Sequence, residues 1–246
     1  MIPGAVTIAY LHPGELASCF ADSLWDVMLT DLTGNARAMS HPHGKLAKEC
    51  GTGGIVDGRN RVAKVMCDES EAEWLWFVDS DMGFAADTLE RLIAAADPVE
   101  RPIVGALCFS HKSAGRSSFY GIKYVAQPTI YQWVETDDKV GVTPVFDYPE
   151  DQLVECVATG GACVLIHRTV FERMRAKFGD VWFDPITHPK GPTTFSEDLS
   201  FFLRVAMLDL PVFVHTGIKT THDKGGVYLD EEFYLWQRDR APLART

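Results

Sequence analysis

The segment Trp74–Asp81, with the sequence WLWFVDSD, passes directly from an unbroken apolar run to two carboxylates. A short continuous apolar run of this kind is typical of a strand that is buried on both faces of a sheet. Such sheets are mostly parallel and are covered by helices on both sides. We therefore expect Trp74–Val78 to be a central strand whose two tryptophans lie in the core, with Asp79 and Asp81 at its end.

Strand and helix patterns alternate on either side of this segment. In the first 108 residues we expect strands at Ala5–Leu11, Ala36–Met39, Trp74–Val78 and Pro102–Cys108, and helices at Glu15–Leu32, Arg59–Cys67 and Ala85–Ala96. The Gly- and His-rich segment His41–Gly58 and the polar segment Ser110–Ser118 are expected to be loops. In the second half we expect a hairpin of Thr129–Glu135 with Val140–Phe146, strands at Leu153–Ala158, Ala162–His167 and Pro211–His215, and helices at Thr169–Phe178, after Ser196 and at Asp230–Arg238. This order predicts an α/β fold with a mostly parallel central sheet flanked by helices and a small antiparallel portion in the second half.

The composition narrows the class of protein. The 246 residues carry 23 Lys and Arg against 34 Asp and Glu, a net charge of −11, whereas binding to a nucleic-acid backbone requires clustered basic residues. No apolar run approaches the ~18 residues of a membrane span, and the first residues lack the basic start of a signal peptide. The six cysteines form no CxxC pair, which indicates free thiols in a reducing compartment. We predict a cytoplasmic protein with no membrane span and no strong nucleic-acid signature.

Asp79 and Asp81 form the only D-x-D sequence in the chain. They follow the predicted strand at the edge of the sheet where α/β proteins bind ligands, and two carboxylates there repel each other unless a cation lies between them. Mg²⁺ and Mn²⁺ take a few carboxylate oxygens and complete their coordination with phosphates and water. The structural alternative is an N-cap of the helix near Ala85 plus a solvated turn residue. Because a cap needs only one Asp, we favour a metal site.

A second acidic group, Ser196-Glu197-Asp198, opens a predicted helix. A Ser cap with acids in the first turn is a complete structural explanation for it. However, the group follows the Pro- and Gly-rich loop Asp184–Thr194, a kind of segment that closes over substrates. A carboxylate at the end of such a loop can act as a general base. His222, in a later polar loop, is either a solvated residue or a third ligand of a divalent ion.

The order of these features resembles the GT-A glycosyltransferases of family-2 type. The similarity extends from about Thr7 to His222. It rests on an ordered set of motifs, namely Arg59-Asn60, Trp74–Phe84 (WLWFVDSDMGF), Gly160-Gly161, Glu197-Asp198 and His222. The resemblance implies a Rossmann-like GT-A fold in a single domain over residues 1–246, with a nucleotide-binding half at 1–108 and an acceptor-binding half at 109–246.

The resemblance also implies roles for individual residues. Asp79 would contact the nucleotide ribose or base, Asp81 would hold a divalent ion on the donor diphosphate, and the candidate metal ligands are Asp79, Asp81 and His222. The Asp of the Glu-Asp pair is the base in inverting members, so Asp198 is the candidate base and Glu197 would position the acceptor or the donor sugar. The remaining candidate contacts to the nucleotide-sugar are His12, Pro13, Glu15, Arg59, Ser80, Gly160 and Gly161.

The activity that the resemblance implies is that of a metal-dependent, hexosyltransferase-like glycosyltransferase. Its cofactor would be Mn²⁺ or Mg²⁺ and its donor a nucleotide-sugar, foremost a UDP- or GDP-sugar. The acceptor would be a hydroxyl of a glycan, a protein, a small molecule or a modified base. The ion would stabilise the departing diphosphate as a Lewis acid. The absence of a Q-x-x-R-W stretch after the acidic pair indicates a single transfer rather than processive synthesis.

Two other functions remain as alternatives. A nucleotidyltransferase also places acids and a metal beside a nucleotide, but its usual basic loop after the first strand is missing from His12–Glu15. A degenerate GT-A domain would serve as a binding or structural module. The presence of Asp79, Asp81, Asp198 and His222 in one chain argues against such decay.

Several further residues have both a functional and a structural interpretation. His41, His43 and Cys50 lack the paired spacing of a zinc site, and Gly51–Gly54 lacks the ending of a P-loop. A small basic patch that either is solvated or faces a phosphate consists of His111, Lys112 and Arg116. The aromatic residues that either stack on a sugar ring or pack in the core are Tyr120, Tyr131, Trp133 and Trp182.

Overall fold

The structure, a computed structural model, describes residues 2–35, 37–38, 41, 43–50, 53–113, 124–137, 140–192 and 194–240. The described helices are α1 (Ser18–Thr33), α2 (Gly54–Asp68), α3 (Thr88–Ala95), α4 (Arg168–Phe178), α5 (Glu197–Ala206) and α6 (Glu231–Arg240). The first strands are β1 (Ile2–His12), β2 (Lys45–Cys50), β3 (Ala72–Val78), β4 (Met82–Phe84), β5 (Ile103–Leu107), β6 (Phe109–Ser113) and β7 (Tyr124–Pro128). The later strands are β8 (Tyr131–Glu135), β9 (Val140–Pro144), β10 (Leu153–Cys156), β11 (Cys163–His167), β12 (Val212–Asp223) and β13 (Tyr228–Leu229).

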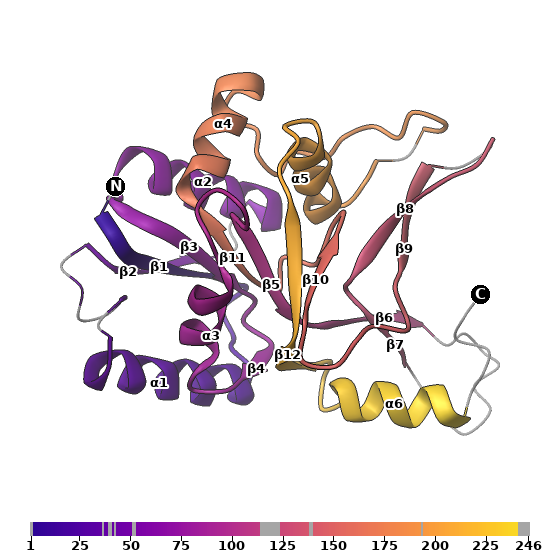
Figure 1. Cartoon of the computed structure of the whole chain (residues 1–246), viewed down its shortest axis with the longest axis horizontal. Helices are drawn as coiled ribbons and strands as arrows, with labels where there is room; N and C mark the ends of the chain where they lie inside the picture. The colour runs from indigo at the N-terminus through magenta and orange to yellow at the C-terminus, as the bar shows by residue number, and fades with distance from the viewer. Residues whose placement is uncertain are drawn as a thin grey trace.

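A central sheet runs through the molecule in the strand order β10-β12-β5-β11-β3-β1-β2 (Figure 1). β1 pairs in parallel with β2 and β3, and β12 pairs in parallel with β5. β11 runs antiparallel between β3 and β5, and β10 runs antiparallel to β12 at one edge. The strands β2, β1, β3, β5 and β12 therefore share one direction. This arrangement confirms the predicted α/β fold with a mostly parallel sheet.

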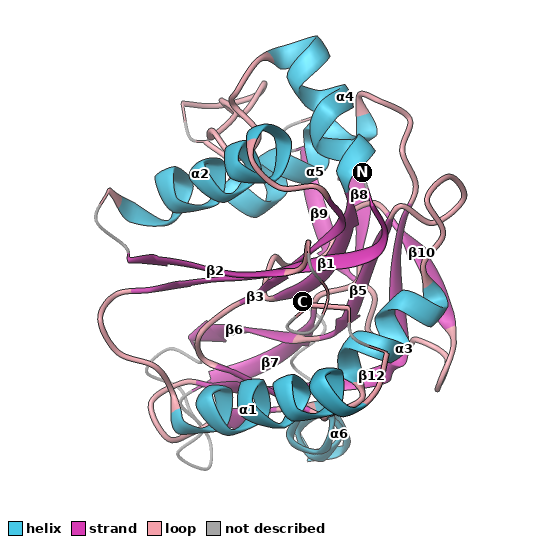
Figure 2. Ribbon diagram, turned by 90° about the vertical axis from the view of Figure 1, so that its left-hand side faces the viewer, coloured by secondary structure: helices cyan, strands magenta, loops and turns pink. Residues whose placement is uncertain are grey.

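Helices cover both faces of this sheet, with α2, α4 and α5 on one side and α1, α3 and α6 on the other (Figure 2). This layering explains the apolar run of β3, because alternate side chains of a strand point to opposite faces. Leu75 and Phe77 join the core on one face, and Trp74, Trp76 and Val78 join the core on the other. Both tryptophans are buried, as predicted.

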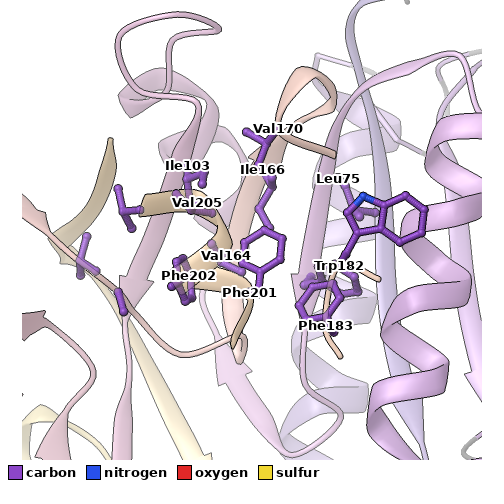
Figure 3. Packing of buried hydrophobic residues seen from close by; sticks show 14 of the residues in the cluster. Leu75, Ile103, Val164, Ile166, Val170, Trp182, Phe183, Phe201, Phe202 and Val205 are labelled. Carbon is purple, nitrogen blue, oxygen red and sulfur yellow. The ribbon is translucent and has the colours of Figure 1, made fainter. Parts of the chain in front are cut away.

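The core on the α5 side of the sheet is rich in aromatic residues (Figure 3). Phe201 and Val205 lie one helical turn apart on α5 and are both buried. Trp182 is only 1% exposed, and its indole N–H donates a hydrogen bond of 2.9 Å to the carbonyl of Phe171. Trp182 is therefore a core residue and not a surface on which a sugar could stack.

The second strand of the fold is not where the sequence pattern placed it. We expected a strand at Ala36–Met39, of which Ala36 and Met39 lie outside the described residues, and a loop over His41–Gly58. The next described strand after β1 is instead Lys45–Cys50, and α2 already begins at Gly54. Arg37 and Ala38 instead form a bend, and their N–H groups donate to the carboxylate of Asp31. The sequence of β2 does not show it as a strand, because this edge strand, which pairs with β1, mixes apolar and charged residues (KLAKEC) without the two-residue alternation of a half-buried strand.

The last strand of the central sheet is much longer than predicted. We expected it to end at His215 with His222 in a loop, but β12 continues to Asp223. Its register against β5 shifts between His215 and Lys219, and the buried Thr216 and Thr220 place polar residues at inward positions where the sequence pattern looks for apolar ones. Beyond the shift, β12 pairs antiparallel with the short β4, and His222 lies opposite Met82.

The antiparallel portion of the second half consists of two small sheets. The pair β8–β9 is the predicted hairpin, with Trp133 opposite Val142, and the pair β6–β7 extends from the end of β5. Helix α6 covers β7, since the Gln237 side chain binds the backbone of Tyr124 and Ala126. Within the described part of the chain, none of the helices combines the length and the hydropathy that crossing a bilayer would require.

Candidate active site

A buried arginine joins the two acidic motifs of the sequence. Arg59, on α2, is 1% exposed and lies between the rings of Phe77 and Phe183, with its guanidinium carbon 5.7 Å from each ring centroid. One guanidinium nitrogen donates to Asp79 at 3.0 Å and the other donates to Asp198. The guanidinium of Arg59 thereby joins the end of β3 to the start of α5, which are far apart in the sequence.

Backbone hydrogen bonds also hold Asp79 and Asp198 in place. The N–H of Asp79 donates to the carbonyl of Ala162 at 2.9 Å, and the N–H of Gly161 donates to the second carboxylate oxygen of Asp198 at 3.1 Å. Ser196 caps α5 through the N–H of Leu199, as the sequence predicted. The carboxylate of Asp198 is thus bound on both oxygens, by Arg59 and by Gly161. This binding holds the carboxylate in one orientation.

Asp81 belongs to a second cluster, formed with β12. The pairing of β4 with β12 brings His222 beside it, and one oxygen of Asp81 lies 3.1 Å from Nε2 of His222 and 2.8 Å from the ammonium of Lys224. Nδ1 of His222 lies 2.8 Å from the carbonyl oxygen of Phe109. A carbonyl can only accept, so Nδ1 carries a proton in this contact. Nε2 is the nitrogen that faces Asp81: it donates to the carboxylate when it also carries a proton, and it is the nitrogen that can bind a cation when it does not.

The electrostatic environments of the two D-x-D carboxylates differ. Burial raises the pKa of Asp79 to about 6, against the lowering effect of Arg59 and with further raising by the charges of Asp198 and Asp81. Burial also acts to raise the pKa of Asp81, but the hydrogen bonds and charges of His222 and Lys224 overcome it and lower the pKa to about 2. Asp81 is therefore a firmly ionised carboxylate, as an anionic ligand of a cation must be.

A cavity of about 370 Å³ lies beside these groups, and Asp81 is not among the described residues that line it but contacts His222, which does. Four residues predicted from the sequence line it, namely Asp79, Gly160, Asp198 and His222. Its other walls come from β6, β7, the β8–β9 hairpin and the start of α5. A concave site of this size with a few convergent polar groups is typical of small-ligand binding.

The two glycines before β11 have different surroundings. A Cβ on Gly160 would lie 3.5 Å from the nearest atom, a methyl carbon of Thr129, which is ordinary contact. A Cβ on Gly161 would overlap the guanidinium of Arg59 and come within 2.6 Å of the Asp198 carboxylate. Gly160 thus lines the cavity, whereas Gly161 makes room for the buried ion pair below it.

The substitution Gly161→Ala should therefore lower the free energy of unfolding by about 1–3 kcal/mol, the usual cost of overpacking. Gly160→Ala is the matched control, and we expect its stability to stay within about 0.5 kcal/mol of the wild type. Urea denaturation of the two variants measures both values. Equal stability of the two variants would contradict the close packing around Arg59.

Some predicted residues lie apart from this cavity. His12, at the end of β1, and the exposed Pro13 and Glu15 are not among the described residues that line it. The carbonyl oxygen of Ser80 accepts a hydrogen bond from the N–H of Ala17, just before α1. Glu197 is half-buried beside Asp198, and burial, followed by the charge of Asp198, raises its pKa.

Two basic residues near the cavity, Lys224 and Lys112, were not among the predicted site residues. The sequence position of Lys224 could have indicated its place beside Asp81. Lys224 follows His222 by two residues at the end of a strand, so its side chain reaches the same face. Lys112 was grouped with His111 in a basic patch whose preferred interpretation was a solvated loop, but both residues line the cavity on β6. Arg116 lies outside the described residues, as do Tyr120 and part of the Gly51–Gly54 segment.

The residues fit a divalent ion in part. No cluster of three or more His, Cys, Asp or Glu side chains that could hold a metal occurs among the described residues, and Asp79, one of the predicted ligands, is bound by Arg59. Asp81 and Nε2 of His222 nevertheless form a two-ligand set of the right chemistry, with an ionised oxygen and an imidazole whose tautomer is fixed by Phe109. Such a pair suits an ion that takes its remaining ligands from phosphates and water.

Comparisons with known proteins identify the fold. No family model matches the chain, and no curated protein matches it. Among solved structures, the crystal structure of A197 from STIV matches with a TM-score of 0.54 at 12% identity, over 93% of this chain and 91% of that chain. The glycosyltransferase GalNAc-T7, in a crystal structure with UDP, GalNAc and Mn²⁺, matches with a TM-score of 0.55 at 11% identity. The fold is GT-A-like.

The second of these matches covers 90% of this chain but only 44% of GalNAc-T7, so the chain spans less than half of that protein's length. At such low identities the similarity shows the fold alone. The cavity lies at the edge of the sheet at which β3 and β5 end, which is the edge where open α/β sheets generally bind ligands.

Proposed function

We propose that this protein is a metal-dependent glycosyltransferase that moves a sugar from a nucleotide-diphosphate donor to an acceptor hydroxyl. The observation that carries the proposal is the convergence of Asp79, Asp198 and His222 on one cavity, with Asp81 bound to His222. These residues come from three distant parts of the chain, and a structural module would have no need to bring them together. One sheet that interleaves strands of both halves of the chain also supports a single domain.

On this proposal, Asp81 and His222 hold the divalent ion, and the ion supplies Lewis-acid stabilisation of the departing diphosphate when it is bound. Lys224, already at Asp81, adds a positive charge on the same side of the site. Asp79 lies on the donor side as a candidate contact to the nucleotide. Arg59 is too deeply buried to reach a nucleotide directly, and so we assign it the role of positioning Asp79 and Asp198.

Asp198 is the proposed general base. Its carboxylate lines the cavity and is held by Arg59 and Gly161. These donors hold the carboxylate in place, and a carboxylate can accept a proton from an acceptor hydroxyl. Glu197, on the same turn of α5, is the candidate for positioning one of the substrates. A base facing the sugar from the side opposite the diphosphate would give inversion of the anomeric centre.

Asp81→Asn tests the donor site directly. The amide loses the negative charge that attracts the ion, so we expect Mn²⁺-dependent affinity for the nucleotide-sugar to fall by at least ~10–100-fold. Isothermal titration with UDP- and GDP-sugars, each with and without Mn²⁺, measures the change. Asp87→Asn, at an exposed carboxylate a few residues away, is the matched control and should bind as the wild type does. Unchanged Mn²⁺ dependence in Asp81→Asn would refute the metal assignment.

A further inference from the structure

The β8–β9 hairpin forms one wall of the cavity. Tyr131, Val142 and Pro144 line the cavity from this hairpin. Tyr131 lies directly opposite Pro144 in the register of the two strands. Residues that face each other across an antiparallel pair point to the same side, and so do alternate residues along each strand. The cavity-facing side of the hairpin is therefore defined by these three residues.

Trp133 lies on that same side. It follows Tyr131 by two residues and is opposite Val142 in the register, so its indole continues the wall outward from the cavity. The side chain is 38% exposed, whereas Trp74, Trp76 and Trp182 are all buried in the core. An indole surface is thus exposed on the cavity side of the hairpin, two residues beyond Tyr131, which lines the cavity together with Asp198.

The part of the cavity near this wall presents neutral hydrogen-bonding groups. The hydroxyls of Tyr131 and Ser110 lie 3.4 Å apart, and those of Thr129 and Thr159 also lie 3.4 Å apart. Burial raises the pKa of Tyr131, which keeps its hydroxyl uncharged. Hydroxyl groups that can both donate and accept are the partners that sugar hydroxyls require.

We propose that Trp133 and the cavity side of the hairpin form an acceptor subsite for an uncharged hexopyranoside. The apolar C–H face of the ring would pack flat on the indole, and the ring hydroxyls would bind the hydroxyls of Tyr131 and Ser110. This subsite rests on the proposed transferase function, because it places an acceptor hydroxyl within reach of Asp198. A nucleobase also stacks on indole, but the net charge of −11 opposes a nucleic-acid acceptor.

The loop before α5 is bound to the β8–β9 hairpin, which forms this wall of the cavity. Nε2 of His188 lies 2.6 Å from the carbonyl of Val140, and the ammonium of Lys190 lies 3.3 Å from the Glu135 carboxylate. His188 also lies against the ring of Phe195, at 5.0 Å between centroids. The segment that leads to Asp198 is thus fastened to the tip of the hairpin, so that Trp133 and the base belong to one connected wall.

Saturation-transfer NMR with methyl β-D-glucopyranoside and methyl β-D-galactopyranoside tests the subsite. We expect transfer to the ring protons of at least one glycoside in the wild type, and about tenfold weaker binding in Trp133→Ala, corresponding to ~1.4 kcal/mol. Trp133→Phe, which keeps an aromatic face, should bind with intermediate affinity. Trp236→Ala is the matched control. That residue is 39% exposed on α6 and is not among the residues that line the cavity, so its substitution should leave glycoside binding unchanged.

Titration of the same samples with UDP- and GDP-sugars in Mn²⁺ separates the subsite from the transferase function. A wild type that binds a donor but neither glycoside overturns the subsite and leaves the donor site standing. Glycoside binding that survives Trp133→Ala, or a saturation-transfer signal from thymidine in place of the glycosides, also overturns it. Glycoside binding lost in Trp133→Ala, without donor binding in the wild type, supports a saccharide site and refutes the transferase.

Discussion

Arg59→Met should destabilise the protein by about 3–5 kcal/mol, the cost of removing one partner from a buried ion pair. The substitution leaves Asp79 and Asp198 without the charge that lies between them, in a site where Arg59 itself is only 1% exposed. For a domain of this size the loss corresponds to a fall in Tm of roughly 6–20 °C. Thermal and urea unfolding followed by circular dichroism measure it.

Arg61→Met is the matched control for this prediction. Arg61 lies two residues further along α2 and pairs with Glu49 at 2.9 Å, but its side chain is 42% exposed. We expect its loss to cost no more than about 1 kcal/mol, as for other exposed ion pairs. Arg59→Lys should fall between the wild type and Arg59→Met, since one ammonium cannot bridge both carboxylates as the guanidinium fork does. An Arg59→Met variant as stable as Arg61→Met would refute the positioning role.

Asp198→Asn should reduce turnover by roughly 10²–10⁴-fold, the usual contribution of a general base. The amide has nearly the shape of the carboxylate and retains an oxygen that can accept from Arg59 or Gly161, but it cannot take a proton from an acceptor. Donor affinity should stay within about threefold of the wild type. Release of nucleoside diphosphate at saturating donor measures turnover, and calorimetry measures donor binding.

Asp209→Asn is the control for charge removal near α5. Asp209 is exposed just beyond the helix and has a φ of 52°, a conformation that Asn also accepts readily. We expect full activity from this variant. Full activity in Asp198→Asn would exclude the base role. Loss of donor binding together with activity would instead assign Asp198 to the donor site.

The fold was largely predictable because its central strands are buried on both faces. An unbroken apolar run followed by carboxylates, as at Trp74–Asp81, has few other structural interpretations. The edge strand β2 carries the opposite kind of sequence, with exposed charged residues, and was therefore assigned to a loop. The predicted end of β12 at His215 has a different cause: burial alternates without a break from Val212 to Thr220, but the inward positions include the polar Thr216 and Thr220, so the apolar signal stops early.

Four of the predicted residues, Asp79, Gly160, Asp198 and His222, line one cavity, but the contacts that they make were not predicted. The resemblance to the GT-A glycosyltransferases suggested a shared role for Asp79, Asp81 and His222. It did not reveal that Arg59 binds Asp79 while His222 contacts Asp81. Side-chain partnering across more than a hundred residues depends on strand order and register. Lys224 was missed for the same reason, because its partner Asp81 becomes its neighbour only through the pairing of β4 with β12.

The central claim is that this chain binds a nucleotide-sugar through a divalent ion. Thermal unfolding of the wild-type protein with UDP-, GDP-, CDP-, ADP- and dTDP-sugars, each with Mn²⁺ and with EDTA, tests it most directly. A donor at a hundredfold its Kd adds about 2.7 kcal/mol, or roughly 5–11 °C in Tm for a domain of this size. We predict such a shift for one nucleotide class and its loss in EDTA. No shift with any donor, or an equal shift in EDTA, would contradict the claim.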